Sequence, residues 1–152
     1  MESLHEYWMR LALDEARMAA EQGEIPIGAV VVRNGELISK AHNMCEIKKS
    51  AVAHAEILAI EEASRKLGSW RLSDCTLYVT LEPCPMCTGA IINARVQKLV
   101  FAAKDPRAGA CGSLINIPSY PMGSHPTVEY GVMQNESLDL LRAFFAKMRQ
   151  QK

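Results

Sequence analysis

TLYVTLEPCPMC, residues 76–87, combines two local patterns that together limit the possible folds. Thr76 to Leu81 is a short, mostly apolar run that is typical of a strand. Pro85 follows where a proline favours the first turn of a helix, and we predict that this helix continues to Ala94. The stretch is therefore a strand that leads directly into a helix, with two cysteines at the junction.

The residues before this stretch predict a helix, a hairpin and a second helix. Ile27 to Val32 and Glu36 to Ile38 flank Asn34-Gly35, a strong hairpin signal because both central residues of a type I′ turn need positive φ. Ala53 to Leu67 has helical periodicity and ends before Gly68. The first helix is expected to end at Gly23, and Glu15 interrupts its apolar face. We place Tyr7 and Trp8, which lie on this face, in the core. The face consists of Leu4, Tyr7, Trp8, Leu11, Ala12, Met18 and Ala19.

The residues after this stretch complete an alternating pattern of strands and helices. Lys98 to Ala103 is predicted to be a strand, residues 104–126 a long loop, Thr127 to Met133 a final strand and Ser137 to Arg149 a closing helix. Strands that alternate with helices predict an α/β fold in which the later strands run parallel. We therefore expect one domain over residues 1–152, with a three-layer α/β/α architecture and a mixed central sheet of about five strands.

Length and composition exclude several classes of protein. A chain of 152 residues can bury a core without disulfides, and 49% hydrophobic with 22% charged residues is an ordinary globular balance. No apolar run approaches the roughly 20 residues needed to cross a bilayer, and the acidic N-terminus does not resemble a signal peptide. We therefore expect no membrane partner and a cytoplasmic location.

Charge is balanced overall but unevenly distributed. Residues 95–152 carry eight basic and four acidic side chains. This excess offers a modest basic face to a polyanion, although the neutral chain lacks the strong long-range attraction of most nucleic-acid-binding proteins. A solvated helix end explains the charge equally well.

Cysteine and histidine spacing indicates a metal site. An odd number of cysteines in a reducing compartment argues for metal binding or catalysis rather than for a disulfide framework. Cys84 and Cys87 lie one helical turn apart at a predicted helix N-terminus, where free N–H groups favour thiolates. His54 can supply a third ligand, and Zn²⁺ accepts this combination in tetrahedral geometry, although iron is also compatible with it.

The number of ligands separates two hypotheses about the metal. A structural zinc site needs four protein ligands, and no second Cys-x-x-Cys pair is present. The remaining candidates are His5, His42, His125, Cys45, Cys75 and Cys111. Three ligands would leave one position for water, which is the catalytic arrangement. Four ligands would instead indicate a zinc-stabilised RNA-binding module without catalysis.

Glu56 follows His54 by two residues and is the candidate proton acceptor of the catalytic hypothesis. Zinc lowers the pKa of water at the open position, and a nearby carboxylate can take the released proton and return it to a substrate. Glu56 alone would be an unremarkable glutamate at a helix start. Together with His54 and the two cysteines, it indicates a general acid–base.

His-x-Glu followed by Pro-Cys-x-x-Cys is similar to the signature of the zinc nucleobase deaminases. The chain resembles the bacterial tRNA-specific adenosine deaminases over almost its whole length. The segments that carry this resemblance are residues 23–30, 41–43, 53–56, 77–84 and 105–109, with Phe144-Phe145 in the last helix.

The resemblance implies a fold, an activity and partners. The fold would be the cytidine-deaminase-like α/β/α fold, and the protein would be a homodimer with one Zn²⁺ per subunit. His54, Cys84 and Cys87 would hold the zinc, and Glu56 would move protons. The substrate would be the anticodon stem-loop of a tRNA, expected to be an arginine tRNA, whose wobble adenosine is converted to inosine.

The resemblance also implies a set of substrate-binding residues. Asn43 would meet the target nucleotide, Pro26, Ile27 and Gly28 would line the base pocket, Glu82 and Asp105 would lie near the flanking nucleotides, and Phe145 would approach the RNA while Phe144 packs in the core. Because a stacked base cannot be attacked, the adenosine must be splayed into the pocket. The loop 104–126 and the closing helix are the expected RNA-reading surface.

Two departures and one alternative substrate class accompany this hypothesis. Ser124-His125-Pro126 replaces an Asn-His-Arg segment common in the family, and the chain lacks the longer basic tail of some relatives. The same chemistry would also serve a deaminase of free cytidine, cytosine or guanine. Residues 105–109 and Phe144-Phe145 favour the tRNA substrate.

Overall fold

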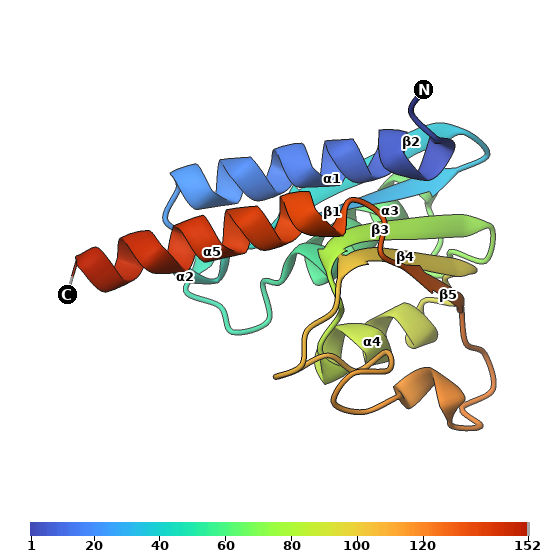
Figure 1. Ribbon diagram of the computed structural model, residues 1–152. Helices are drawn as coiled ribbons and strands as arrows, with labels where there is room; N and C mark the ends of the chain where they lie inside the picture. The colour runs from blue at the N-terminus through green and yellow to red at the C-terminus, as the bar shows by residue number, and fades with distance from the viewer. Residues whose placement is uncertain (152) are drawn as a thin grey trace.

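A computed structural model describes residues 1–151 and contains a five-stranded sheet with helices on both faces (Figure 1). The helices are α1 (Leu4–Glu21), α2 (Cys45–Lys48), α3 (Ala55–Leu67), α4 (Pro85–Asn93) and α5 (Gln134–Gln150), with a short 3-10 helix over Ile117–Ser119. The strands are β1 (Gly28–Arg33), β2 (Glu36–His42), β3 (Cys75–Leu81), β4 (Lys98–Ala103) and β5 (Thr127–Tyr130). No helix in this part of the chain has the length and apolar character needed to cross a membrane.

The strand order in the sheet is β2-β1-β3-β4-β5. β1 pairs antiparallel with both β2 and β3, whereas β3, β4 and β5 run parallel to one another. The parallel pairs follow from the connections, since α4 carries the chain from the end of β3 back to the start of β4, and residues 104–126 do the same between β4 and β5. The predicted mixed sheet with parallel later strands is confirmed.

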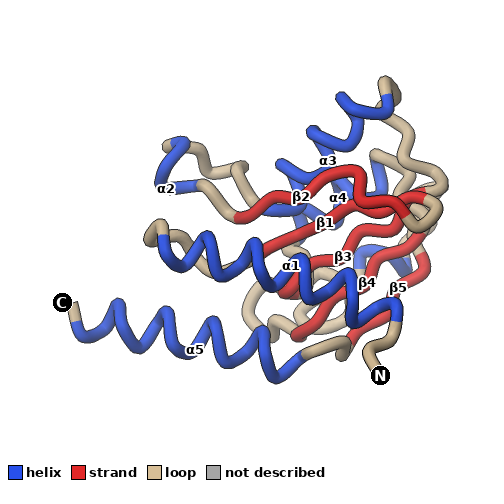
Figure 2. Tube along the Cα trace, turned by 90° about the horizontal axis from the view of Figure 1, so that it is seen from above, coloured by secondary structure: helices blue, strands red, loops and turns tan. Residues whose placement is uncertain are grey.

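The helices form the two outer layers of the predicted α/β/α architecture. Figure 2 shows α1 and α5 side by side along one face of the strands, and these helices contact each other as well as the sheet. One apolar cluster, which includes Met9, Leu13 and Val100, lies between α1 and the sheet, and the other, which includes Ile91 and Phe101, lies between the sheet and α3 with α4. The predicted three-layer architecture is therefore confirmed.

The apolar face of α1 differs from the predicted one. Trp8 is buried as expected, but Tyr7 is 42% exposed, and Leu4 and Met18 also face solvent. Consecutive helical residues point about 100° apart, so the side that buries Trp8 turns Tyr7 outward. The placement of Tyr7 in the core is wrong.

The local signals for turns and helix ends are confirmed. Asn34 and Gly35 have φ values of 51° and 76°, as the type I′ hairpin requires. Gly68 ends α3 as predicted, with a φ of 66°. The reciprocal capping box of Ser3 and Glu6 at the start of α1 was not among the predictions. Beyond the hairpin, β2 continues to His42, past its predicted end at Ile38.

The C-terminal elements begin and end at other residues than predicted. β5 ends at Tyr130 because Gly131 turns the chain with a φ of 88°, and α5 begins at Gln134 rather than at Ser137. Ser137 is buried in the first turn of α5, where its hydroxyl donates to the carbonyl oxygen of Thr80 at 2.5 Å. This bond ties the closing helix to β3.

Candidate active site

The predicted metal ligands come from two helix N-termini on the same face of the sheet. His54 is the N-cap residue of α3, Cys84 is the N-cap residue of α4, and Cys87 lies in the first turn of α4. Pro85 occupies the first turn of α4, where its missing N–H removes no helical hydrogen bond. The direct passage from β3 into α4 thus places both cysteines beside the start of α3.

The distances between these residues fit a tetrahedral zinc ion. His54 Nδ1 lies 3.4 Å from Cys87 Sγ and 3.7 Å from Cys84 Sγ. Ordinary zinc–nitrogen and zinc–sulfur bond lengths at a tetrahedral angle place such atoms about 3.6 Å apart. One ligand atom from each of the three residues lies within 4.8 Å of the others. The group is therefore spaced to hold one metal ion.

Among residues 1–151, the cluster has three His, Cys, Asp or Glu members. Other candidates have partners elsewhere: His5 bonds to Tyr78, His42 to Glu15 and Cys111 to Thr88. A tetrahedral ion held by this group would keep one position free of protein ligands. Three protein ligands with one open position are typical of catalytic zinc sites, whereas structural zinc sites have four protein ligands.

The two cysteines share a proton unequally. A hydrogen bond from the Cys87 thiol lowers the pKa of Cys84 to about 4, and His54 acts in the same direction. The pKa of Cys87 is raised, since its proton is held against the Cys84 thiolate and its side chain is buried. The site therefore presents an anionic sulfur to a cation.

Glu56 lies in the first turn of α3 and is 4% exposed. Burial raises the pKa of its carboxyl to about 7, because a charged form is poorly solvated there. A carboxyl with this property, next to the cluster, is suited to accept and return a proton near neutral pH. Glu56 lies close enough to His54, Cys84 and Cys87 for these residues to affect its pKa.

The predicted pocket residues around Asn43 adjoin the end of β2. Asn43 is 5% exposed, and its backbone N–H donates to the carbonyl oxygen of Ile27 at 3.1 Å. Pro26 is buried, while Ile27 is half-buried and packs against the apolar cluster that lies under α3 and α4. Pro26, Ile27 and Asn43 therefore lie together on two neighbouring segments.

Gly28 also has a structural role at the contact between β1 and α1. A Cβ atom on Gly28 would lie 2.0 Å from the carbonyl oxygen of Ala12 and 2.6 Å from the backbone nitrogen of Ala16. The side-chain direction of Gly28 is thus toward α1. The residue is a glycine because α1 approaches β1 too closely for any side chain.

Glu82 and Asp105 lie next to each other, but Glu82 is more deeply buried than Asp105. Glu82 is 2% exposed, and its carboxylate accepts the N–H of Asp105 at 3.0 Å. Asp105 is half-buried, and its Oδ1 accepts the N–H of Arg107 at 3.0 Å. Glu82 therefore contacts the loop after β4, and Asp105 shapes the same loop.

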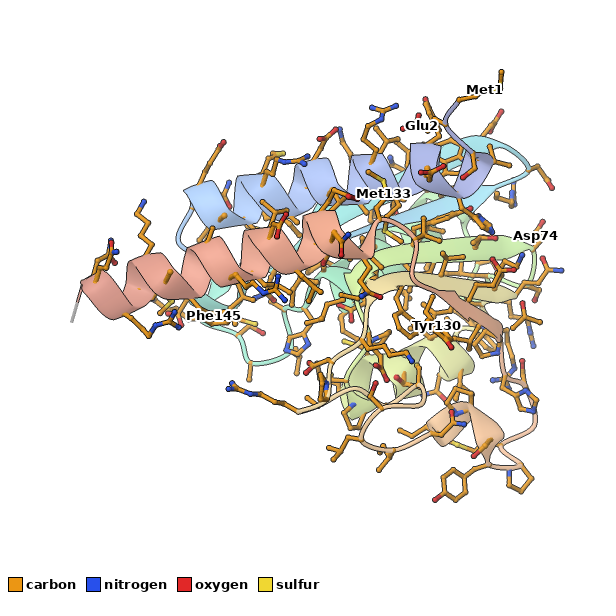
Figure 3. The ribbon with its side chains drawn as sticks, viewed as in Figure 1. Met1, Glu2, Asp74, Tyr130, Met133 and Phe145 are labelled. Atoms are coloured by element: carbon orange, nitrogen blue, oxygen red, sulfur yellow. The ribbon has the colours of Figure 1, made fainter. Side chains whose placement is uncertain are left out.

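Phe145 lies on the part of α5 that extends past the sheet (Figure 3), and Phe144 precedes it in the same helix. Phe145 is 40% exposed, and Phe144 is half-buried but belongs to neither apolar cluster. The two rings pack edge to face, with centroids 5.4 Å apart. The placement of Phe144 in the core is only partly correct, since the end of α5 has no sheet beneath it.

Sequence reasoning missed two buried acids near the site. Glu15 on α1 accepts from Nδ1 of His42 at 2.9 Å, next to Asn43. Glu24 accepts the N–H groups of Glu46 and Ile47 at 3.1 and 2.8 Å, which holds the start of α2. The one available signal was Glu15 itself, an acid that interrupts an apolar helical face.

Comparisons with known proteins agree with this geometry. The profile of the MafB19-like deaminase family matches residues 3–148. The tRNA-specific adenosine deaminase of Bacillus subtilis (strain 168) is 49% identical over 97% of this chain and 92% of its own length. The chain belongs to the tRNA-specific adenosine deaminase family.

Solved structures show the same fold for this deaminase. One, from work on A-to-I editing by tRNA:A34 deaminases at the wobble position of transfer RNA, has a TM-score of 0.86 and 44% identity over 89% of this chain and 99% of that one. Guanine deaminase from Nitrosomonas europaea has a TM-score of 0.80 and 30% identity, over 96% of this chain and 86% of that one. The mixed five-stranded sheet is therefore the cytidine-deaminase-like fold expected from the sequence.

Proposed function

We propose that this deaminase hydrolyses the wobble adenosine of a tRNA anticodon, expected to be that of an arginine tRNA, to inosine. The observation that carries the proposal is the buried Glu56 beside a three-residue metal cluster. The strong similarity to a tRNA-specific adenosine deaminase over nearly the whole chain supports the substrate. Residues 1–152 would form one catalytic domain.

Nδ1 of His54 and the sulfurs of Cys84 and Cys87 would hold one Zn²⁺ per subunit. The spacing of these atoms and the thiolate character of Cys84 support this assignment. A bound Zn²⁺ would lower the pKa of a water molecule and so supply hydroxide near neutral pH. The chain itself must then manage the protons.

Glu56 would carry both protons of the reaction. Its carboxylate would take a proton from the attacking water and deliver it to N1 of adenine as oxygen adds to C6. It would then relay the second proton to the amino group on C6, which leaves as ammonia. Water and adenosine thus give inosine and ammonia, and the carboxyl returns to its starting state.

The base would reach this carboxyl only after leaving its stack in the anticodon loop. We propose that Asn43 binds the target nucleotide beside the cluster and that Pro26 and Ile27 line the base pocket, with Gly28 contributing backbone. Asp105 and Phe145 would approach the flanking nucleotides, since both are at least partly exposed.

The assembly would be a homodimer that works in the cytoplasm, where its tRNA substrate is found. Exposed apolar side chains such as Leu114, Tyr120 and Met122 in the loop after β4 are compatible with a covered surface. Sedimentation of the zinc-loaded chain measures its oligomeric state directly. A monomer at micromolar concentration would contradict the proposed homodimer.

Incubation with defined substrates tests the proposed function. The zinc-loaded chain is given an anticodon stem-loop with adenosine at the wobble position, a matched stem-loop with guanosine there, and free adenosine, cytidine, cytosine and guanine. We expect inosine only in the adenosine stem-loop, detected by nucleoside mass spectrometry. Turnover of guanine alone would favour the second candidate, a guanine deaminase, which the 30% identical structure supports.

A further inference from the structure

Glu82 is a buried acid that no cation neutralises in the described part of the chain. Its side chain is 2% exposed, and it appears in none of the ion pairs within residues 1–151. Burying a carboxylate is costly unless donors surround it. The position therefore requires a specific set of hydrogen-bond partners.

The donors all come from one loop. Oε1 accepts the N–H of Asp105 at 3.0 Å and the hydroxyl of Ser113, while Oε2 accepts the N–H of Cys111 at 2.9 Å and that of Ser113 at 3.1 Å. Three backbone amides and one hydroxyl thus converge on a single carboxylate. Hydrogen bonds to an ionised acceptor are stronger than neutral ones, so this carboxylate holds the loop strongly at Asp105, Cys111 and Ser113.

The loop is also shaped sterically around this carboxylate. A Cβ atom on Gly109 would lie 2.4 Å from the carboxyl carbon of Glu82 and 2.5 Å from the carbonyl oxygen of Asp105. The N–H of Ala110 donates to the carbonyl oxygen of Pro83 at 2.8 Å. Both the side chain of Glu82 and the backbone that follows it therefore hold the loop.

The same short segment connects the loop to the metal cluster. Glu82 precedes Cys84 by two residues, and β3 fixes the chain immediately before it. At the outer side of the loop, Asp105 accepts the N–H of Arg107, and both Pro106 and Arg107 are exposed. Because Glu82 joins the loop to the residues just before Cys84, the exposed loop tip at Pro106 and Arg107 has a defined position relative to the cluster.

We propose that Glu82 is a positioning residue that sets the conformation of residues 105–113 for recognition of the nucleotides next to the target base, without touching the RNA itself. This inference rests on the proposed function. It replaces the expectation that Glu82 lies among the RNA contacts, because a carboxylate with both oxygens occupied and 2% exposure has no face to offer a nucleotide.

Glu82→Gln tests the inference, with Glu36→Gln on the exposed hairpin as the matched control. Glutamine keeps the shape of the side chain but turns an NH₂ group toward donors. We expect KM for the anticodon stem-loop to rise about tenfold or more, because a charged acceptor is lost from a buried network. We expect kcat at saturating RNA to stay within about threefold, since Glu56 and the ligands are unchanged. Hydrogen exchange at the Cys111 and Ser113 amides should accelerate by a similar factor to KM.

Ser113 supplies a milder pair of variants in case Glu82→Gln does not fold. Ser113→Ala removes one donor to the carboxylate, whereas Ser113→Thr keeps the hydroxyl. We expect KM to rise about threefold to tenfold in the alanine variant and to return toward the wild-type value in the threonine variant.

Several outcomes would overturn the inference. One is faster amide exchange with an unchanged KM, and another is loss of kcat or of zinc with KM preserved, which would place the role of Glu82 at Cys84. If the wild-type chain forms inosine and the Glu82 and Ser113 variants have the wild-type KM, the positioning role is refuted but the proposed function stands. A wild-type chain that forms no inosine from the stem-loop would refute the proposed function and this inference together.

Discussion

Glu15 and His42 form a buried pair between the middle of α1 and the last residue of β2, with Oε1 of the carboxylate 2.9 Å from Nδ1 of the imidazole. Both side chains are about nine-tenths buried, and the second ring nitrogen of His42 lies 3.0 Å from Oε1 of Gln22. This network fixes the residue immediately before Asn43. The end of β2 is thus held in place by α1, which lies on the other face of the sheet from α3 and α4.

Glu15→Ala should lower the free energy of unfolding by about 3 kcal/mol, because it leaves Nδ1 of the buried His42 imidazole without a hydrogen-bond partner. For a domain of this size, such a loss corresponds to a drop in Tm of about 10 °C. The control is Glu21→Ala, an exposed glutamate at the end of the same helix. Equal Tm values for the two variants, measured by circular dichroism, would contradict a stabilising role for the pair.

Gly28→Ala should destabilise the fold by about 3 kcal/mol, since the added methyl group would meet backbone atoms of α1 that cannot rotate away. Gly89 on α4 provides the opposite case, because a Cβ there has no atom within 4 Å. Gly89→Ala should therefore be neutral or stabilise by up to about 1 kcal/mol. Urea unfolding of both variants measures the difference, and a Gly28→Ala variant with wild-type stability would show that α1 is not held as closely as described.

Glu56→Gln should keep the fold and the zinc content but lower kcat for inosine formation by about a thousandfold or more, because glutamine cannot carry a proton. Glu61→Gln, an exposed position on α3, is the control and should retain full activity. Single-turnover assays on the anticodon stem-loop separate the chemical step from RNA release. Substantial residual turnover would mean that another group moves the protons.

Cys84→Ser and Cys87→Ser should each abolish stoichiometric zinc binding, since a hydroxyl is a far poorer ligand than a thiolate at neutral pH. Cys45→Ser is the matched control, because Cys45 lies outside the three-residue cluster. Atomic emission spectroscopy of the purified variants gives the zinc content. One zinc per chain in either cluster variant would require a different ligand set.

Cys111 should react slowly with iodoacetamide in the zinc-loaded protein. Burial raises the pKa of its thiol to about 11, so about one molecule in a thousand carries the reactive thiolate at pH 8. The rate should increase about tenfold for each pH unit up to that pKa, because the ionised fraction grows in the same proportion. Peptide mapping by mass spectrometry at pH 7 to 10 measures it, and a rate that levels off near pH 8.5 would contradict the raised pKa.

Local patterns predicted the elements that depend on neighbours in the chain. Asn34-Gly35 predicted the hairpin because positive φ is a property of those two residues, and Pro85 predicted the start of α4 because of its fixed φ and missing N–H. Cys84 and Cys87 are one helical turn apart in any helix, so their joint orientation was readable. The residue type of His54 marked it as a possible third ligand, but only the packing of α3 beside α4 brings its ring to the two sulfurs.

Contacts between distant segments were not readable in this way. The exposure of Tyr7, the burial of Glu15 against His42 and the start of α5 at Gln134 each depend on which surfaces meet when the layers pack. Residue 28 is a glycine because a Cβ atom there would lie 2.0 Å from the carbonyl oxygen of Ala12, and no periodicity encodes how closely α1 packs on β1.

The chemistry of this protein was thus visible in its residue types and short spacings, because metal ligands and helix starts obey local geometry. The environment of that chemistry was visible only in three dimensions. Whether a carboxylate such as Glu82 faces RNA or a ring of backbone amides depends on where a loop 23 residues later returns, and packing alone determines that path.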